Sequence, residues 1–143
     1  MNTETIYAAL FALAAATPGI QTSSRKLALP DDVNGPDCPA LFMTQGDQEA
    51  FPLERGPTKW VLQADLYLYF HQSDIPTDGV FQMAINSQLD ALRVQLDPPP
   101  GLEEQTLGGL VTRCRLKGKI QVYDGSLSER ALAIAPVEII ANA

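Results

Sequence analysis

Few side chains in this sequence have the types and spacing that catalysis requires. His71 is the only histidine, and at the end of a predicted strand it could act as a general base. No motif places a nucleophile beside it, which favours a surface or interface histidine. Asp65 lies on the same predicted strand face, where a single carboxylate is typical of a solvated or ion-paired residue. Glu103-Glu104 follows a proline run and indicates a solvated loop.

The motif content also argues against an enzyme. Gly108-Gly109 follows no predicted strand and leads into Leu110, so it predicts a bend rather than a phosphate cradle. The sequence contains no nucleophile elbow, P-loop, dinucleotide fingerprint or H-E-x-x-H zinc motif. We therefore expect no enzyme activity, no catalytic residues, no cofactor and no metal site.

The clearest chemical pattern is a run of basic residues on alternate positions of the predicted strand Leu110–Tyr123. Arg113, Arg115, Lys117 and Lys119 supply four of the ten Lys and Arg residues, and the period of two directs them to one face. Three interpretations remain open. The charges form a solvated face that pairs with acids on neighbouring strands, Asp65 among them. Alternatively they form a contact with an acidic protein, or a phosphate-binding surface for nucleic acid. No Phe or Trp interleaves the run for base stacking, which weakens the nucleic-acid interpretation.

A complementary acidic segment lies earlier in the chain. Between residues 31 and 54 there is no Lys or Arg, and the acids are Asp31, Asp32, Asp37, Asp47, Glu49 and Glu54. Opposed acidic and basic regions on one small chain predict head-to-tail contacts between identical copies, which close into rings when the rotation permits. Tyr7 and Phe11 form a second apolar stripe on the first predicted helix. The candidate subunit or partner contacts are Arg113, Arg115, Lys117, Lys119, Asp31, Asp32, Asp47, Glu49, Tyr7 and Phe11.

The composition is that of one folded domain over residues 1–143. Hydrophobic residues make up 45% of the 143, which is enough for a core, and the net charge of −7 argues against whole-surface binding to nucleic acid or anionic lipid. No window of 18 uncharged apolar residues predicts a membrane span. Cys38 and Cys114 are expected to be free thiols in a reducing compartment. Residues Ile6–Ala16 resemble a signal peptide core, but Glu4 and the lack of a basic residue before them favour a helix that is retained.

Periodicity predicts the elements of the first half. Ile6, Leu10 and Leu13 predict a helix that starts at Asn2 or Thr3 and stops at Thr17-Pro18-Gly19. We expect a short strand at Arg25–Leu29 and a loop at Pro30–Pro39. Two strand pieces, Ala40–Thr44 and Ala50–Leu53, are predicted to be joined by a turn at Gln45–Gln48. Strict alternation from Trp60 to His71 predicts a long strand with one face in the core.

The second half predicts one helix and two long strands. Asp78 is a candidate cap for a helix whose apolar residues are Phe81, Ile85, Leu89, Leu92 and Leu96. Asp97-Pro98 ends that helix. The strand Leu110–Tyr123 leads to a turn at Asp124-Gly125 and a final strand Leu132–Ile140, where Pro136 predicts an edge position or a bulge. The order α-β-β-β-α-β-β predicts an α+β fold with an antiparallel or mixed sheet packed with two main helices.

The ordered set of segments resembles the tail terminator proteins of long-tailed bacteriophages. The resemblance covers most of the chain and rests on the order of elements together with short segments. These segments are Pro39-Ala40-Leu41-Phe42, Ile85-Asn86, Leu107-Gly108-Gly109-Leu110-Val111, Gly118-Lys119-Ile120, Asp124-Gly125 and Ala133-Ile134-Ala135-Pro136-Val137.

The resemblance implies a structural virion subunit, assembled in the host cytoplasm, at the head-proximal end of the tail. Its copies would form a hexameric ring on the tail tube protein, stop tube growth and offer a docking face to the head-tail connector. DNA would pass through the bore without specific binding. The resemblance implies no catalytic residues, cofactor or membrane contact. Two alternatives stay open: another neck protein of the head-tail joint, and a nucleic-acid-binding module that uses the basic strand face.

Overall fold

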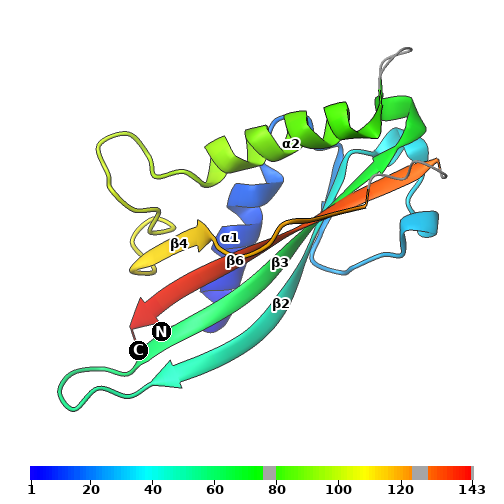
Figure 1. Cartoon of the computed structure of the whole chain (residues 1–143). Helices are drawn as coiled ribbons and strands as arrows, with labels where there is room; N and C mark the ends of the chain where they lie inside the picture. Colours follow the sequence, from blue (N-terminus) through cyan, green and yellow to red (C-terminus); the bar gives the residue numbers. More distant parts are fainter. Residues whose placement is uncertain (76–79, 124–128, 143) are drawn as a thin grey trace.

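The computed structural model describes residues 1–75, 80–123 and 129–142 and has an α+β fold (Figure 1). The described helices are α1 (Thr3–Ala15) and α2 (Phe81–Leu96), with short 3-10 turns at Pro30–Asp32, Gly35–Asp37 and Gln72–Asp74. The strands are β1 (Thr22–Ser24), β2 (Ala40–Phe51), β3 (Lys59–His71), β4 (Arg113–Leu116), β5 (Gln121–Tyr123) and β6 (Arg130–Asn142). The predicted fold class is confirmed.

The six strands form one mixed sheet in the order β1-β2-β3-β6-β4, and β5 also pairs with β6. Only the short β1 runs parallel to its neighbour β2, and the other pairs are antiparallel. The pair β3–β6 stays in register along the full length of β3. These two strands are therefore the centre of the sheet.

Both helices pack on one face of the sheet, and α1 lies behind the strands in Figure 1. Even-numbered residues of β3 from Leu62 to Phe70 and odd-numbered residues of β6 from Ala131 to Ala141 are buried there. The small Ala side chains of β6 leave room for the large side chains of the helices, Ile6, Leu10, Ile85 and Leu92. We call this side of the sheet the core face.

The helix boundaries follow from local chemistry. The Asn2 side chain accepts a hydrogen bond from the backbone N–H of Thr5 at 3.0 Å, which caps α1 as predicted. Helix α2 begins after Val80, which provides no side-chain cap, and ends at Asp97 before three prolines. The predicted cap Asp78 lies outside the described residues, as does the predicted turn Asp124-Gly125.

A loop covers one end of the opposite face of the sheet. Val33 and Cys38 pack there against Ala40, Phe42 and Tyr69. The Tyr69 hydroxyl donates to the carbonyl of Ala28 at 2.7 Å, and Arg130 donates to the carbonyl of Val33. The predicted strand at Arg25–Leu29 is wrong because this segment belongs to the covering loop, and the strand lies earlier, at Thr22–Ser24.

The predicted turn at Gln45–Gln48 is also wrong, because β2 runs unbroken through it. Gln45 pairs with Ala64 and Gln48 pairs with Leu62, so Gly46 and Asp47 together stand opposite Gln63. This is a β-bulge, in which two residues of one strand face one residue of the other. The Tyr7 hydroxyl donates to the Gln63 carbonyl at 2.9 Å, which supplies a partner where the ladder is disturbed.

The predicted long strand Leu110–Tyr123 is in fact two short strands, β4 and β5, separated at residues 117–120. Gly118 adopts a φ of 116°, which only glycine tolerates easily, and a Cβ there would lie 3.2 Å from Pro136 Cγ. Pro136 is not on an edge strand, because β6 has neighbours on both sides. Its carbonyl accepts from the Lys117 N–H at 3.1 Å, so its missing N–H faces the break between β4 and β5.

Candidate interaction surface

The face of the sheet opposite the helices is left uncovered beyond the loop, and we call it the open face. Directly paired residues point to the same face of a sheet, so the registers define its members. They are Glu49 on β2, Val61, Gln63 and Asp65 on β3, Pro136, Glu138 and Ile140 on β6, and Arg113 and Arg115 on β4. Charged, polar and apolar side chains are therefore mixed on this face of the central strands.

Four basic residues were predicted to share one strand face. Two of them, Arg113 and Arg115, lie on β4 and point to the open face. Lys117 follows the strand and joins them through a shared acid, Glu138. Lys117 Nζ donates to Glu138 Oε2 at 2.8 Å, and Arg115 Nη2 lies 3.6 Å from Glu138 Oε1. Lys119 lies in the break after Gly118 and is exposed. The prediction of one shared strand face therefore holds for Arg113 and Arg115 and is wrong for Lys117 and Lys119, which lie beyond the end of β4.

Glu138 is a candidate residue of this surface that sequence reasoning missed. Only 13% of its side chain is exposed. Partial burial acts to raise the pKa of Glu138, but the hydrogen bond from Lys117 and the charges of Lys117, Arg115 and Arg113 outweigh it, and the pKa is lowered. The sequence does contain a signal for its position. Glu138 is an even-numbered residue of the alternating final strand, and this alternation puts it on the same face as Ile134, Pro136 and Ile140.

The solvated-face interpretation included Asp65 among the acids that pair with the basic residues, and the structure does not show that pairing. Asp65 stands opposite Pro136, and within the described part of the chain no ion pair joins it to Arg113, Arg115 or Lys117. Glu138 takes that role because it is the direct partner of Arg115 across the β4–β6 pair. Asp65 and Lys117 both line a hollow of about 310 Å³ around Pro136 and Gly118.

The six acids do not form one acidic region. Asp31, Asp32 and Asp37 lie in the covering loop before β2, and Asp31 Oδ1 lies 3.6 Å from Arg130 Nε. Asp47 and Glu49 lie in the second half of β2, and Glu54 follows its end. Because β2 is twelve residues long, the two acidic groups lie at opposite ends of a strand about 40 Å long.

Tyr7 and Phe11 pack inside the subunit. Tyr7 has no exposed surface, and its hydroxyl is used by Gln63, so it contributes to the core rather than to a surface for a partner. Burial raises the pKa of Tyr7. Phe11 is partly buried against the same core cluster. The apolar surface of α1 is largely covered by the sheet and α2.

His71 and the two cysteines have structural surroundings. His71 caps the short turn Gln72–Asp74: its Nδ1 accepts from the Ser73 N–H at 3.2 Å, and its own N–H donates to Asp74 at 2.8 Å. Burial raises the pKa of Cys38 to about 11 and that of Cys114 to about 12. Both cysteines are free in the described structure. Their thiols are therefore protonated and unreactive near neutral pH.

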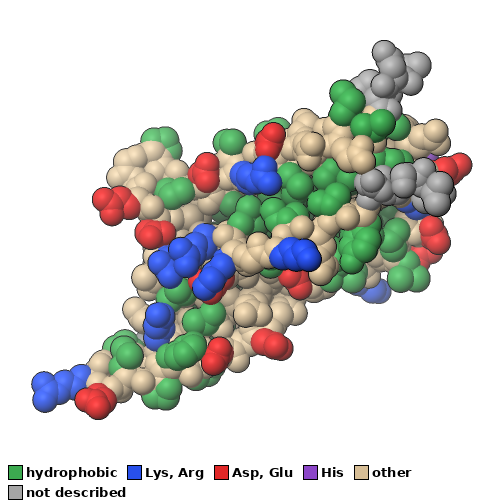
Figure 2. Space-filling view, in the orientation of Figure 1, with side chains coloured by type: hydrophobic (Ala, Val, Ile, Leu, Met, Phe, Trp, Pro, Cys, Tyr) green, Lys and Arg blue, Asp and Glu red, His purple; other side chains and the backbone are tan. Residues whose placement is uncertain are grey.

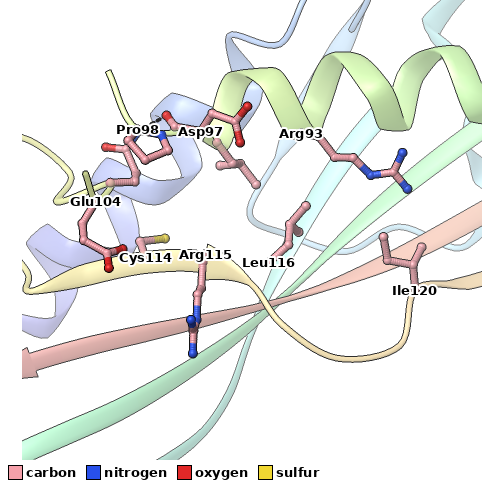
Figure 3. A pocket seen from close by; sticks show the side chains of 10 residues that line it. Arg93, Asp97, Pro98, Glu104, Cys114, Arg115, Leu116 and Ile120 are labelled. Carbon is pink, nitrogen blue, oxygen red and sulfur yellow. Dashed lines mark hydrogen bonds between the residues drawn. The ribbon is translucent and has the colours of Figure 1, made fainter. Parts of the chain in front are cut away.

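A hollow of about 360 Å³ lies between the end of α2, the following loop and β4 (Figure 3). Arg93 approaches it from α2, and Asp97 and Glu104 lie at its other end, while Arg115 points away toward the open face. Within the described residues no three His, Cys, Asp or Glu side chains cluster as metal ligands. Among the described helices none is long and apolar enough to cross a membrane.

No protein-family model and no curated protein matches this chain. A solved structure described as the virion of a native gene transfer agent particle contains a similar chain, with 12% sequence identity and a TM-score of 0.48. The similarity covers 96% of this chain and 92% of that chain.

Proposed function

We propose that this chain is a structural subunit of a phage-like virion, and specifically a tail terminator. In this role its copies form a ring, hexameric when docked, on the last ring of the tail tube. The ring ends tube growth and presents a face to the head-tail connector. The protein works by occupying a surface, and the proposal assigns it no reaction.

The observation that carries this proposal is the charge distribution of an uncovered sheet. Acids with no ion pair in the described structure lie along the outer half of β2, and cations gather at β4 on the other side of the sheet. Figure 2 shows Lys and Arg side chains over β4 and acidic ones along the edge of β2. Opposed patches on one chain are suited to repeated head-to-tail contacts. The order of elements agrees with the sequence resemblance to tail terminators.

The geometry gives less support to nucleic-acid binding. A phosphate-binding strand face needs a row of cations that can contact successive phosphates and displace the counterions condensed on the nucleic acid. Here Glu138 lies among Arg113, Arg115 and Lys117, and the strand breaks before Lys119. A ring whose other surfaces are acidic would instead let DNA pass through its bore without trapping it.

Deletion of the gene from a virus that encodes this chain tests the proposed function. We expect tails that exceed the normal length and do not join heads, because the growing tube end presents the same surface after each addition until a different ring covers it. Adding the purified protein to tails halted at the correct length should restore joining. Imaging should locate the protein as one ring at the head-proximal end of the tail.

Electron microscopy of the deletion strain gives the contrary outcome directly. Tails of normal length that are joined to heads would contradict the terminator role. Location of the protein at the tail tip would contradict it as well, while absence of the chain from purified particles would contradict the wider structural role.

A further inference from the structure

A single row of residues crosses the open face and carries opposite charges at its two ends. Glu49 on β2 pairs with Val61 on β3, Val61 pairs with Ile140 on β6, and Ile140 pairs with Arg113 on β4. Four neighbouring strands span about 14 Å, at roughly 4.8 Å for each step. The row thus places an acid at one edge of the sheet and a base at the other, with two β-branched apolar residues between them.

The acidic end of the row is exposed, and within the described residues Glu49 makes no ion pair. Every residue from 45 to 57 is exposed, including Phe51 and Leu53 with 43% and 52% of their surface accessible. Strand β1 pairs with β2 only at Ala40–Phe42, so among the described residues no strand covers the outer edge of β2 beyond it. Asp47, Glu49 and the bulge at Gly46 disfavour direct pairing with another strand edge, as charges and bulges do on natural edge strands.

The basic end of the row lacks an acceptor. Arg113 Nε has almost no exposed surface and no hydrogen-bond partner in the described structure. Arg113 also lines a hollow of about 290 Å³ with Lys59, Glu104 and Ile140, and no ion pair within the described residues joins it to Glu104. An incoming carboxylate would therefore find space, the two cations Arg113 and Lys59 against the one acid Glu104, and an apolar wall formed by Ile140.

The two ends cannot meet within one subunit because the sheet separates them. They can meet between copies, when the β2 edge of one copy lies beside the β4 edge of the next. The contact runs through side chains, since the outward N–H of Cys114 on β4 already donates to the carbonyl of Gln105 at 2.7 Å. It is heterologous, because different surfaces of the two copies meet, and repetition of such a contact generates a ring or a filament.

We propose that neighbouring copies bind through these two edges, with Glu49 of one copy in the hollow beside Arg113 of the next. This inference rests on the proposed function for its ring and identifies the surfaces that join the ring. The exposed Phe51 is the last residue of β2 and the exposed Leu53 follows it closely, so the contact also covers apolar surface.

Cysteine cross-linking tests the contact. The double variant Ala50→Cys/Thr112→Cys keeps Glu49 and Arg113 and places an exposed thiol next to each of them. It is treated with a short bismaleimide over protein concentrations from micromolar to millimolar. The native thiols Cys38 and Cys114 are buried and protonated. We expect a ladder of linked species that ends at the ring size. Each single cysteine variant should give no ladder, because its one thiol has no counterpart across the contact.

The matched control is Asp32→Cys/Thr112→Cys, which keeps Glu49 and Arg113, places the first thiol at an exposed position at the other end of the sheet and should not link. Absence of linked species from the Ala50/Thr112 pair at millimolar protein, or linking equal to that of the control, would overturn the inference. Linked dimers without larger species would overturn it too, because they indicate a two-fold contact. The sedimentation mass of the native chain distinguishes failure of this contact from failure of the proposed ring. If the native chain has the mass of a ring but the double variant does not cross-link, the ring stands and the copies bind through other surfaces.

Discussion

At the scale of single residues, Glu138 holds the basic end of the sheet together. It lies under Lys117 and Arg115 and has one oxygen, Oε1, that accepts no hydrogen bond in the described structure. Three cations gathered at one carboxylate leave a surplus of positive charge that a partner's acid can neutralise. Glu138 therefore fixes the position of the cations without cancelling them.

Replacing Glu138 by Gln should lower the free energy of unfolding by about 1 kcal/mol at pH 7, since its partners are largely exposed. The pKa of Glu138 is lowered in the folded state, so its stabilising effect is present above the unfolded value of 4.5 and is lost as the pH falls through the folded pKa. Urea unfolding at pH 7 and below pH 4 measures this difference, which should shrink at acid pH. The exposed Glu54→Gln serves as the control, and an equal effect of both changes would contradict the role of Glu138.

At the scale of elements, the bulge in β2 separates its buried half from its exposed half. Residues Ala40–Met43 are buried, and every residue after Thr44 is exposed. Gly46 stands close to β3, because a Cβ there would lie 3.0 Å from Gln63 Cβ. The bulge and the Tyr7 hydroxyl together allow the first half of β2 to pack in the core while its second half is exposed on the surface.

The variant Tyr7→Phe should therefore cost about 1 to 2 kcal/mol of stability, because it leaves the Gln63 carbonyl without its donor while keeping the ring. Chemical denaturation measures the change. Tyr123→Phe is the matched control, since 55% of Tyr123 is exposed on β5 and its hydroxyl has no described partner. A loss below 0.5 kcal/mol for Tyr7→Phe, within the usual range for surface changes, would show that water replaces the hydroxyl.

Elements were predictable where one local pattern decides them. The spacing of Ile6, Leu10 and Leu13 predicts α1, and the alternation around Leu62–Phe70 predicts β3. The errors lie where pairing partners decide. Gly46-Asp47 has the composition of a turn but is absorbed as a bulge against Gln63. The alternation through Lys117 continues in sequence, but the strand breaks where Gly118 passes Pro136.

The candidate surface follows the same division. The spacing of the basic residues predicts one strand face for all four, but only Arg113 and Arg115 lie on β4. Glu138 was not predicted, because its contact with Lys117 joins residues 21 positions apart and depends on the register of β4 with β6. The two acidic groups likewise separate only when β2 is known to be one continuous strand.

At the scale of the whole molecule, the two edges of the sheet carry opposite charges. Charge reversal tests whether these edges bind each other between copies. Glu49→Arg makes both ends of the row basic, and Arg113→Glu makes both ends acidic. Each variant alone should fail to associate with itself, because like charges then face each other across every contact. Thermal unfolding should confirm that both remain folded, since surface charges contribute little to stability.

Mixing the two variants in equal amounts should restore association. The acidic edge of the Arg113→Glu copy then faces the native Arg113 of the other variant, and the reversed edges face each other with opposite charges. Strict alternation closes only in rings with an even number of copies, and six satisfies this condition. Sedimentation of the mixture under conditions in which the native chain assembles should give the native mass. Raising the salt should weaken the association by screening the exposed charges.

A mixture that stays monomeric would refute the contact between the two edges. A mixture that stops at a dimer would instead indicate a two-fold interface, in which the same two edges meet twice and no ring can grow.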